Sequence, residues 1–342
     1  MKNIFVALGQ HHVQNFENLI ENKLVGEGDC ILLAGSELIC DPLKWSRIIK
    51  ADRSFNNTAD SAFNQVAAIN FKIRAYKAMI KQISHYKSER TTVFVCYIED
   101  VLSNFLFFSF NKNTKAVVVE DGTLNYYDHS LKNISNIKFL LKQAISQTHG
   151  IPFKKYKGHS SGAEYDHVVC QYLTLPSHSY IQKNVKQLPL DQVNVASFSN
   201  SLYIIGQESY GTLLGQSFFD ASLENFLQNL KKQPFYKDIH TVYYKPHRNG
   251  KQFQDSYFAE VFSDKEVIVL RTEHTSETIY FEKLHSKYVA AFDSSTLINV
   301  YSKLKENNRN QVSFFVNPLK NDELIFMFKK LGFQFLNKEE LK

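Results

Sequence analysis

The strongest constraint on the fold is the regular alternation of short apolar runs with longer segments whose apolar residues recur at helical spacing. Short runs rich in β-branched residues are typical of buried strands, and helices that join such strands give parallel sheets covered on both faces. In the first half of the chain the predicted strands are residues 4–8, 30–34, 91–97, 116–119 and 167–173. Residues 9–12 read as a turn, and the predicted helices are 13–20, 59–86, 98–110 and 134–145.

The alternation stops at residues 174–199, where prolines and a mixture of Ser, Gln, Asn and Lys indicate a connection between domains. It then restarts, with strands predicted at 201–206, 241–244, 267–270, 287–292 and 312–316 and helices at 217–232, 276–284, 295–305 and 322–331. A chain of 342 residues is long enough for two domains. We therefore predict an α/β protein of two Rossmann-like domains, 1–185 and 186–342, that face each other across a cleft.

Composition narrows the class of protein. The net charge of +6 suits anionic substrates or a membrane surface, but no basic stripe interleaved with aromatic residues indicates nucleic-acid binding. The four cysteines are scattered without a CxxC pair, which fits a reducing cytoplasm better than a disulfide framework or a structural zinc. We recognise no secretory signal and no membrane-spanning run. The expectation is a cytoplasmic protein, soluble or peripheral at the inner face of the cytoplasmic membrane.

Two adjacent carboxylates follow the strand at residues 116–119. Glu120 and Asp121, followed by Gly122, stand at the carboxyl end of a Val-Val-Val run, where open α/β sheets bind their ligands. Adjacent carboxylates raise each other's pKa, so one of them can act as a general base toward a sugar hydroxyl. The alternative is an ordinary Asp-Gly turn. We favour Asp121 as the base because its glycine neighbour leaves a freer approach, and Glu120 stays the second candidate.

A second candidate element follows the strand at residues 241–244. Pro246 stiffens the loop, so that Lys245 and His247 are presented from fixed positions. A protonated histidine near a phosphate can donate to a leaving oxygen, although a loop histidine taken alone is more often without a catalytic role. Gly206, at the end of the strand 201–206, is a further candidate for binding the substrate that carries this phosphate.

A third element is the run Ser294, Ser295 and Thr296 between a predicted strand and a predicted helix. The free N–H groups and the dipole at a helix start attract anions, so hydroxyl groups added there would hold a phosphate. The alternative is plain capping of the helix, which any such run can provide.

Gln10, His11 and His12 follow the first strand and are candidates for lining the cleft, with simple solvent exposure as the alternative. Of these, Gln10 and His11 are candidates to contact the acceptor. The remaining histidines lack partners at metal-ligand spacing. The chain also lacks an Asp-x-Asp arrangement, a GxGxxG fingerprint and a P-loop. We therefore predict no metal and no cofactor.

The three strand-end motifs resemble, in type and order, those of bacterial GT-B sialyltransferases, a group that includes lipooligosaccharide sialyltransferases and capsule polysialyltransferases. The resemblance implies the GT-B architecture for the two predicted domains. It implies that Asp121 or Glu120 supplies the base, that His247 assists departure of the CMP phosphate, and that the serine pair binds this phosphate. The motifs that carry it are Glu120-Asp121-Gly122, Lys245-Pro246-His247 and Ser294-Ser295.

Glu277 matches a glutamate that holds the cytidine ribose in these enzymes, because the segment 276–289 is similar to the corresponding region. The chain departs from the pattern in one place. Arg248 follows His247 where the family has proline, so the loop is less rigid and Arg248 is a candidate to contact a carboxylate or phosphate of the substrates.

The resemblance implies an inverting, metal-independent transfer of sialic acid or a related nonulosonic acid from a CMP-activated donor to a capsule or lipooligosaccharide glycan. Other classes stay open at this point. Teichoic-acid-type polyol-phosphate transferases share the Lys-Pro-His loop and the serine pair, but they are expected to lack the Glu-Asp-Gly strand end. A Kdo transferase or a non-catalytic nucleotide-sugar binding protein would also be compatible with these motifs.

Overall fold

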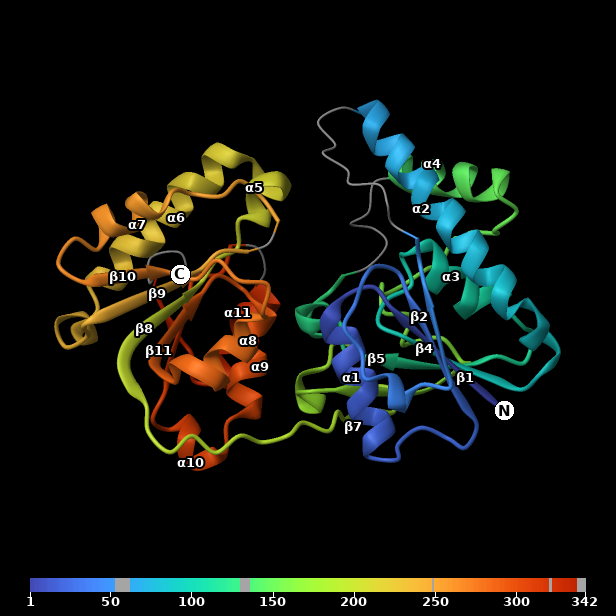
Figure 1. The fold of residues 1–342 in the computed structure, drawn as a ribbon, viewed down its shortest axis with the longest axis horizontal. Coiled ribbons are helices and arrows are strands. Elements are labelled where there is room, and N and C mark those ends of the chain that lie inside the picture. The colour runs from blue at the N-terminus through green and yellow to red at the C-terminus, as the bar shows by residue number, and fades with distance from the viewer. Residues whose placement is uncertain (53–61, 130–135, 248, 320–321, 337–342) are drawn as a thin grey trace. The chain divides into compact units, whose positions relative to one another are not determined.

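The computed structural model describes all residues except 53–61, 130–135, 248, 320–321 and 337–342 (Figure 1). The chain divides into two compact units, Met1–Pro189 and Leu190–Lys342, and each contains a sheet with interleaved helices. The division lies after residue 189 rather than after residue 185. The physical reason is the short strand β7 (Val185–Gln187), which pairs with the first sheet and so belongs to the first unit.

The first unit is built on a seven-stranded sheet in the order β3-β2-β1-β4-β5-β6-β7, and each neighbouring pair runs parallel. Its strands are β1 (Lys2–Ala7), β2 (Asp29–Ala34), β3 (Arg47–Lys50), β4 (Thr91–Val95), β5 (Lys115–Val119), β6 (Val168–Leu173) and β7. Its α-helices are α1 (Gln10–Glu21), α2 (Ala62–Ile83), α3 (Val101–Ser109) and α4 (Asn136–Thr148).

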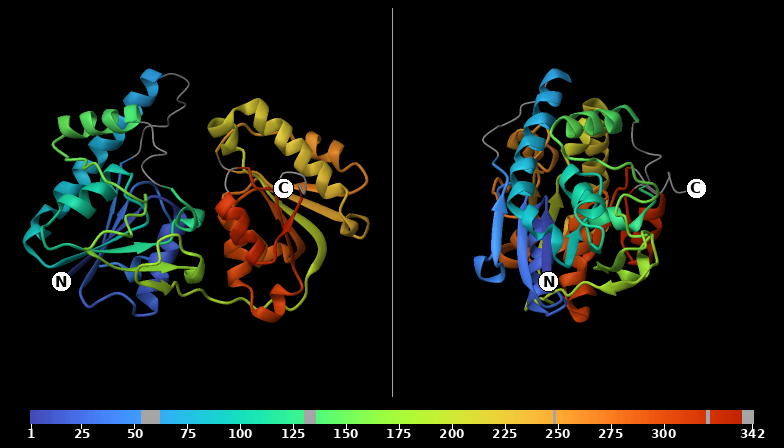
Figure 2. Two further views of the ribbon diagram at one scale, coloured as in Figure 1. Left: turned by 180° about the vertical axis from the view of Figure 1, so that it is seen from behind. Right: turned by 90° about the vertical axis from the view of Figure 1, so that its right-hand side faces the viewer.

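Alternation along the strands distributes the apolar side chains of this unit to the two faces of the sheet. Ile4 and Val6 of β1 belong to one core cluster with residues of α2, α3 and α4. Phe5, between them, faces the other way, stacks on Phe94 at 4.2 Å between ring centroids and packs on Phe16 of α1. Figures 1 and 2 show α2 and α4 side by side over one face of the sheet, with α1 on the other.

The second unit repeats this plan with a six-stranded parallel sheet in the order β10-β9-β8-β11-β12-β13. Its strands are β8 (Ser199–Ile205), β9 (Thr241–Lys245), β10 (Glu266–Val269), β11 (Ser286–Ala291), β12 (Ser313–Val316) and β13 (Gln334–Phe335). Its α-helices are α5 (Ser209–Leu214), α6 (Gln216–Lys231), α7 (Asp255–Val261), α8 (Ser276–Ile279), α9 (Ser295–Lys303), α10 (Glu306–Arg309) and α11 (Asp322–Lys330).

Aromatic side chains dominate the core between this sheet and α6. Phe219 and Phe226 of α6 pack on Phe292, the residue that follows β11, with ring centroids 5.8 and 4.7 Å apart. α8 continues into a single π-helical turn, Tyr280–Leu284, and the ring of Tyr280 stacks on Tyr203 of β8 on the opposite face. The pairing of Ala291 with Ile205 places the carboxyl ends of β11 and β8 beside each other.

Both sheets contain a point where the strand order reverses. In the first unit the chain runs outward from β1 to β3 and then returns to β4 on the other side of β1. In the second it runs outward from β8 to β10 and returns to β11 on the other side of β8. Open parallel sheets bind ligands at the carboxyl ends of the strands that flank this reversal. The serine motif after β11 and the two histidines after β1 follow strands that flank a reversal, and the other two motifs stand at the ends of the next strands, β5 and β9.

Two features of the fold differ from the sequence prediction. Residues 10–12, predicted as a turn, form the first turn of α1, because the helical hydrogen bonds begin directly after Gly9. The short elements β3, β7, β13, α5, α7 and α10 lay outside the prediction.

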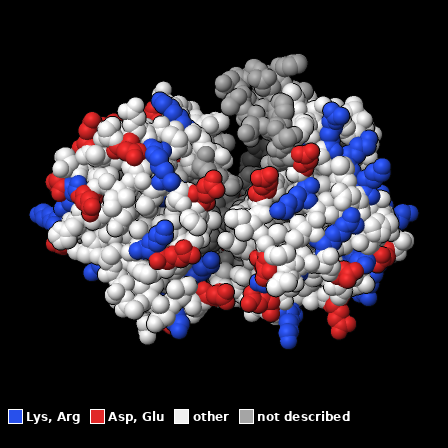
Figure 3. Space-filling model, in the orientation of Figure 1, with Lys and Arg blue, Asp and Glu red and all other residues white. Residues whose placement is uncertain are grey.

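Two properties of the described surface bear on partners. Among the described residues, no helix is long and apolar enough to cross a membrane. On the face shown in Figure 3, lysines and arginines are interspersed with aspartates and glutamates, so that face presents no patch of a single charge.

Candidate active site

Glu120 is a buried structural carboxylate rather than an accessible base. Glu120 directly follows β5 and is 2% exposed, and its carboxylate accepts hydrogen bonds from the Tyr126 hydroxyl and from the Thr174 N–H at 2.5 Å. Burial raises the pKa of Glu120 to about 7, although both hydrogen bonds oppose the shift. Because Tyr126 and Thr174 follow different strands, Glu120 ties the loop after β5 to the end of β6.

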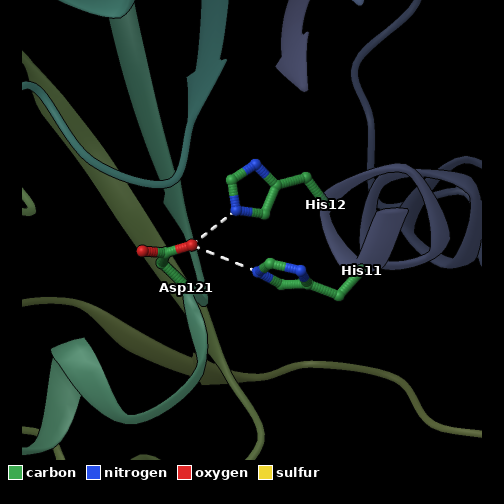
Figure 4. Close-up of side chains that lie close together, drawn as sticks. All are labelled: His11, His12 and Asp121. Carbon is green, nitrogen blue, oxygen red and sulfur yellow. Dashed lines mark hydrogen bonds and ion pairs between the residues drawn. The ribbon is translucent and has the colours of Figure 1, made fainter. Parts of the chain in front are cut away.

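Asp121, the next residue, meets two imidazoles from the start of α1 (Figure 4). Its Oδ1 atom lies 3.1 Å from His11 Nε2 and 2.5 Å from His12 Nε2. The side chain is 18% exposed. Burial alone would raise the pKa of Asp121, but the bonds from the two histidines outweigh it and hold the pKa well below its usual range. The structure thus brings together Asp121 and His11, two residues that the sequence analysis singled out separately.

A backbone hydrogen bond determines the tautomer of His12. The Leu8 N–H points at His12 Nδ1 at 3.1 Å, so Nδ1 accepts and the ring proton is on Nε2, which donates to Asp121. The side chain is buried, and this burial, with the nearby His11, lowers the pKa of His12. His12 is therefore a neutral donor that orients the Asp121 carboxylate.

The ligand atoms of His11, His12 and Asp121 lie within 4.8 Å of one another, a spacing at which side chains also hold metals. The Leu8 N–H argues against that use here. To bind a metal through Nε2, His12 would have to place its proton on Nδ1, where the backbone N–H already points. Metal independence stays a prediction.

In the second unit a buried glutamate that sequence reasoning missed organises the loop after β9. Glu208 is 0% exposed, and it accepts from the Tyr244 hydroxyl at 2.7 Å and from the His247 N–H at 2.6 Å. Burial raises the pKa of Glu208. Gly206 leaves the space for it, since a Cβ at position 206 would lie 2.7 Å from Glu208 Oε2. In the structure, Gly206 allows the Glu208 carboxylate to lie close to the backbone at the end of β8.

The two ends of the Lys-Pro-His loop behave differently. Lys245 is 9% exposed and its Nζ donates to the Thr272 carbonyl at 2.7 Å, so the ammonium group already has a protein partner. Burial lowers the pKa of Lys245. The His247 imidazole is partly exposed, and its Nδ1 lies 3.1 Å from both the N and the O of Asn249. Arg248 lies outside the described residues.

Ser294, Ser295 and Thr296 begin α9, directly after β11. Ser294 is buried and its hydroxyl accepts a hydrogen bond from the Thr296 N–H at 3.3 Å. In this structure Ser294 therefore caps the helix, which was the alternative to phosphate binding. Ser295 and Thr296 are partly exposed. Glu277 lies close to the same helix, where Asn299 donates to its Oε1 at 2.8 Å and leaves Oε2 for another donor.

The described contacts group these second-unit residues around β8. Lys245 is the last residue of β9 and His247 follows it, while Ser294 to Thr296 follow β11. β9 and β11 are the two neighbours of β8. No direct hydrogen bond between the histidine and the serines is present among the described residues.

In the first unit, Gln10 does not join the cluster of Asp121 and the two histidines. Its side-chain amide instead forms two hydrogen bonds with the backbone of Ile39.

Glu208 was not among the predicted site residues, and His12 was considered only as a residue that lines the cleft beside His11. His12 gave a signal, since it stands beside His11 at the end of a predicted strand. Glu208 gave a weaker one, an acidic residue two positions after the strand-ending Gly206. Their importance comes from contacts with residues far along the chain, Asp121 and His247.

A family model described as Alpha-2,8-polysialyltransferase (POLYST) matches residues 3–305 of the chain. No curated protein matches the chain.

Solved structures show the fold. An alpha/beta-galactoside alpha-2,3-sialyltransferase from Photobacterium phosphoreum is 13% identical, with a TM-score of 0.54 over 100% of this chain and 99% of that one. A Photobacterium sp. 2,6-sialyltransferase, in complex with CMP and lactose, is 13% identical, with a TM-score of 0.52 over 99% of this chain and 78% of that one. The GT-B domain of a Photobacterium damselae sialyltransferase is 14% identical, with a TM-score of 0.50 over 98% and 100%. The two Rossmann-like units thus form a GT-B fold, as predicted.

The raised pKa of Glu120 predicts a pH-dependent stability of the first unit. The folded state holds a proton on Glu120 up to a pH of about 7, whereas the unfolded chain releases it near 4.5. The folded state therefore binds more protons in this window, and its stability falls as the pH rises through it, by roughly 3 kcal/mol in total. We expect urea unfolding followed by Trp45 fluorescence to show this decline, and Glu120→Gln, which carries no titratable group, to flatten it.

The control for this experiment is Glu27→Gln, a substitution of an exposed glutamate in the same unit, which should keep the slope of the wild-type protein. The interpretation of Glu120 is wrong if its glutamine variant shows the same pH slope as both of these proteins.

Proposed function

The chain belongs to the alpha-2,8-polysialyltransferase family and is a glycosyltransferase that uses sialic acid, and from this premise we propose that it transfers sialic acid or a related nonulosonic acid from a CMP-activated donor to a glycan acceptor, with inversion. The acceptor we propose is a surface glycan of the capsule or lipooligosaccharide type. One observation carries the proposal: the Asp121 carboxylate, partly exposed and held ionised by two histidines, stands at the carboxyl edge of the first sheet. A carboxylate and two imidazoles in contact form a cluster that can take up a proton from an attacking hydroxyl.

Features of the second unit support a nucleoside monophosphate as the leaving group. The N-terminus of α9 offers the Ser295 N–H, which makes no hydrogen bond to another described residue, together with the hydroxyls of Ser295 and Thr296, and both residues are partly exposed. His247 follows the neighbouring strand β9, and it can donate to the departing phosphate oxygen. In this proposal Glu277 receives the ribose hydroxyls through the oxygen that Asn299 leaves unused.

The proposed reaction is a single displacement. The CMP-activated sugar is β-linked, and no described side chain in either strand-end group is set up as a covalent nucleophile. The acceptor hydroxyl attacks the anomeric carbon while the bond from that carbon to the phosphate oxygen breaks. The product is then an α-linked sugar, with the proton left on the first unit and the electron pair on the CMP phosphate.

Ligand-dependent melting tests the donor class. A ligand at about one hundred times its Kd stabilises the folded state by about 2.7 kcal/mol, which corresponds to roughly 5–10 °C for a unit of this size. We predict such a rise in Tm with CMP and a markedly smaller one with UDP or GDP. Ser295→Ala should reduce the CMP shift, because it removes one of the hydroxyls at α9, while the exposed Ser263→Ala in the same unit should not. Equal shifts with CMP, UDP and GDP would contradict the proposed donor.

Metal independence follows from the same proposal, since a monophosphate can be neutralised by N–H groups, hydroxyls and His247 without a divalent ion. We expect transfer from the CMP-activated donor to continue at an unchanged rate after treatment with EDTA and gel filtration. A rate that falls to the background and returns on addition of Mg²⁺ or Mn²⁺ would show that the donor is held through a metal.

A further inference from the structure

We propose that His11 is the group that takes the proton from the acceptor hydroxyl, and that Asp121 acts as its positioning partner, with His12 fixing the carboxylate in place. The inference rests on the proposed function and refines it, because the sequence motif alone assigns the base to one of the two carboxylates.

Both carboxylates of the motif already accept hydrogen bonds from the protein. Asp121 Oδ1 already accepts N–H groups from both histidines, and Glu120 is buried against Tyr126 and Thr174. A carboxylate whose pKa is held well below its usual range is a weak proton acceptor at neutral pH. The site is therefore better arranged to keep Asp121 charged than to protonate it.

His11 is the most accessible residue of the cluster. The His11 side chain is 47% exposed, against 18% for Asp121 and 2% for His12. Figure 4 shows the His11 ring projecting from the start of α1 toward the carboxylate, separate from the His12 ring. Of the three groups in this cluster, His11 offers the largest surface to an incoming substrate.

The contact with Asp121 determines the tautomer of His11. An ionised carboxylate only accepts hydrogen bonds, so the Nε2 atom that faces Asp121 must carry a proton. Neutral His11 then has its free lone pair on Nδ1. Among the described residues no hydrogen-bond partner occupies this atom.

Gly9 keeps the approach to Nδ1 open. A Cβ built at position 9 would lie 2.9 Å from His11 Cε1 and 3.1 Å from Nδ1, closer than side chains normally pack. Gly9 has an extended backbone with φ −145° and ψ 162°, so a glycine is not required there for conformational reasons. Its missing side chain instead leaves room beside the proton-accepting nitrogen.

These contacts give a balanced proton transfer. As the acceptor oxygen bonds to the anomeric carbon and the carbon–phosphate oxygen bond breaks, the hydroxyl proton moves to His11 Nδ1. The resulting imidazolium is stabilised by the charge of Asp121 and is not opposed by His12, which stays neutral with its proton on Nε2. His11 then releases the proton to solvent.

The test compares variants of His11 in the full-length protein. His11→Gln keeps an amide donor for Asp121 but has no basic nitrogen, so we expect kcat to fall by about 10²–10⁴-fold while the CMP-dependent rise in Tm stays unchanged. His11→Ala should show a similar loss and recover part of its rate as imidazole is added to the assay. Urea unfolding followed by Trp45 fluorescence checks that both variants remain folded.

Two further variants sharpen the comparison. Gly9→Ala is compatible with the backbone but displaces the His11 ring, and it should lower kcat by about 10²-fold. His85→Gln, at an exposed histidine of the same unit, should leave kcat unchanged.

The outcomes separate this inference from the proposed function. Loss of kcat in His11→Gln together with imidazole-dependent recovery of His11→Ala supports His11 as the proton acceptor. Failure of either result, in a wild-type enzyme that transfers sialic acid from the CMP donor, overturns the inference and leaves the proposed function standing. Absence of wild-type transfer from that donor would overturn the proposed function, and this inference with it.

Discussion

The parallel direction of every strand pair is the constraint on which the site depends. Parallel strands deliver their carboxyl ends to one edge of the sheet, and the order of each sheet reverses beside its first strand. In the first unit this arrangement brings the start of α1, after β1, to Asp121, after β5, although the two segments are 109 positions apart in the sequence. In the second unit it places the residues that follow β9 and β11 on either side of β8.

Buried hydrogen bonds then fix the orientation of the side chains at these strand ends. The Leu8 N–H fixes the proton of His12, and through it the orientation of Asp121. Glu120 and Glu208 act in a comparable way in the two units, each buried and each joining a tyrosine hydroxyl to a backbone N–H of a strand-end loop. Because an unpaired buried carboxylate is costly, these bonds hold the loops in one conformation. In the proposed reaction the chemistry falls to the partly exposed groups, His11 and His247.

The sequence predicted both parallel sheets and the strand-end motifs, since hydrophobic periodicity and motif position are local signals. It missed β3, β7 and β13, which have only four, three and two residues and depend on pairing with a neighbour. It also read residues 10–12 as a turn and so overlooked that His11 and His12 share the first turn of a helix. The pairing of His12 with Asp121 and of Glu208 with His247 is set by tertiary contacts, which no spacing in one sequence reveals.

The proposed reaction is a single displacement at the anomeric carbon, which inverts its configuration. The most direct measurement is the anomeric configuration of the product, followed by NMR during transfer from CMP-activated sialic acid to a sialylated acceptor. The account predicts that each CMP released is matched by one new α-linked residue. A product that keeps the β configuration of the donor would contradict it, because a single in-line displacement inverts the configuration of the anomeric carbon.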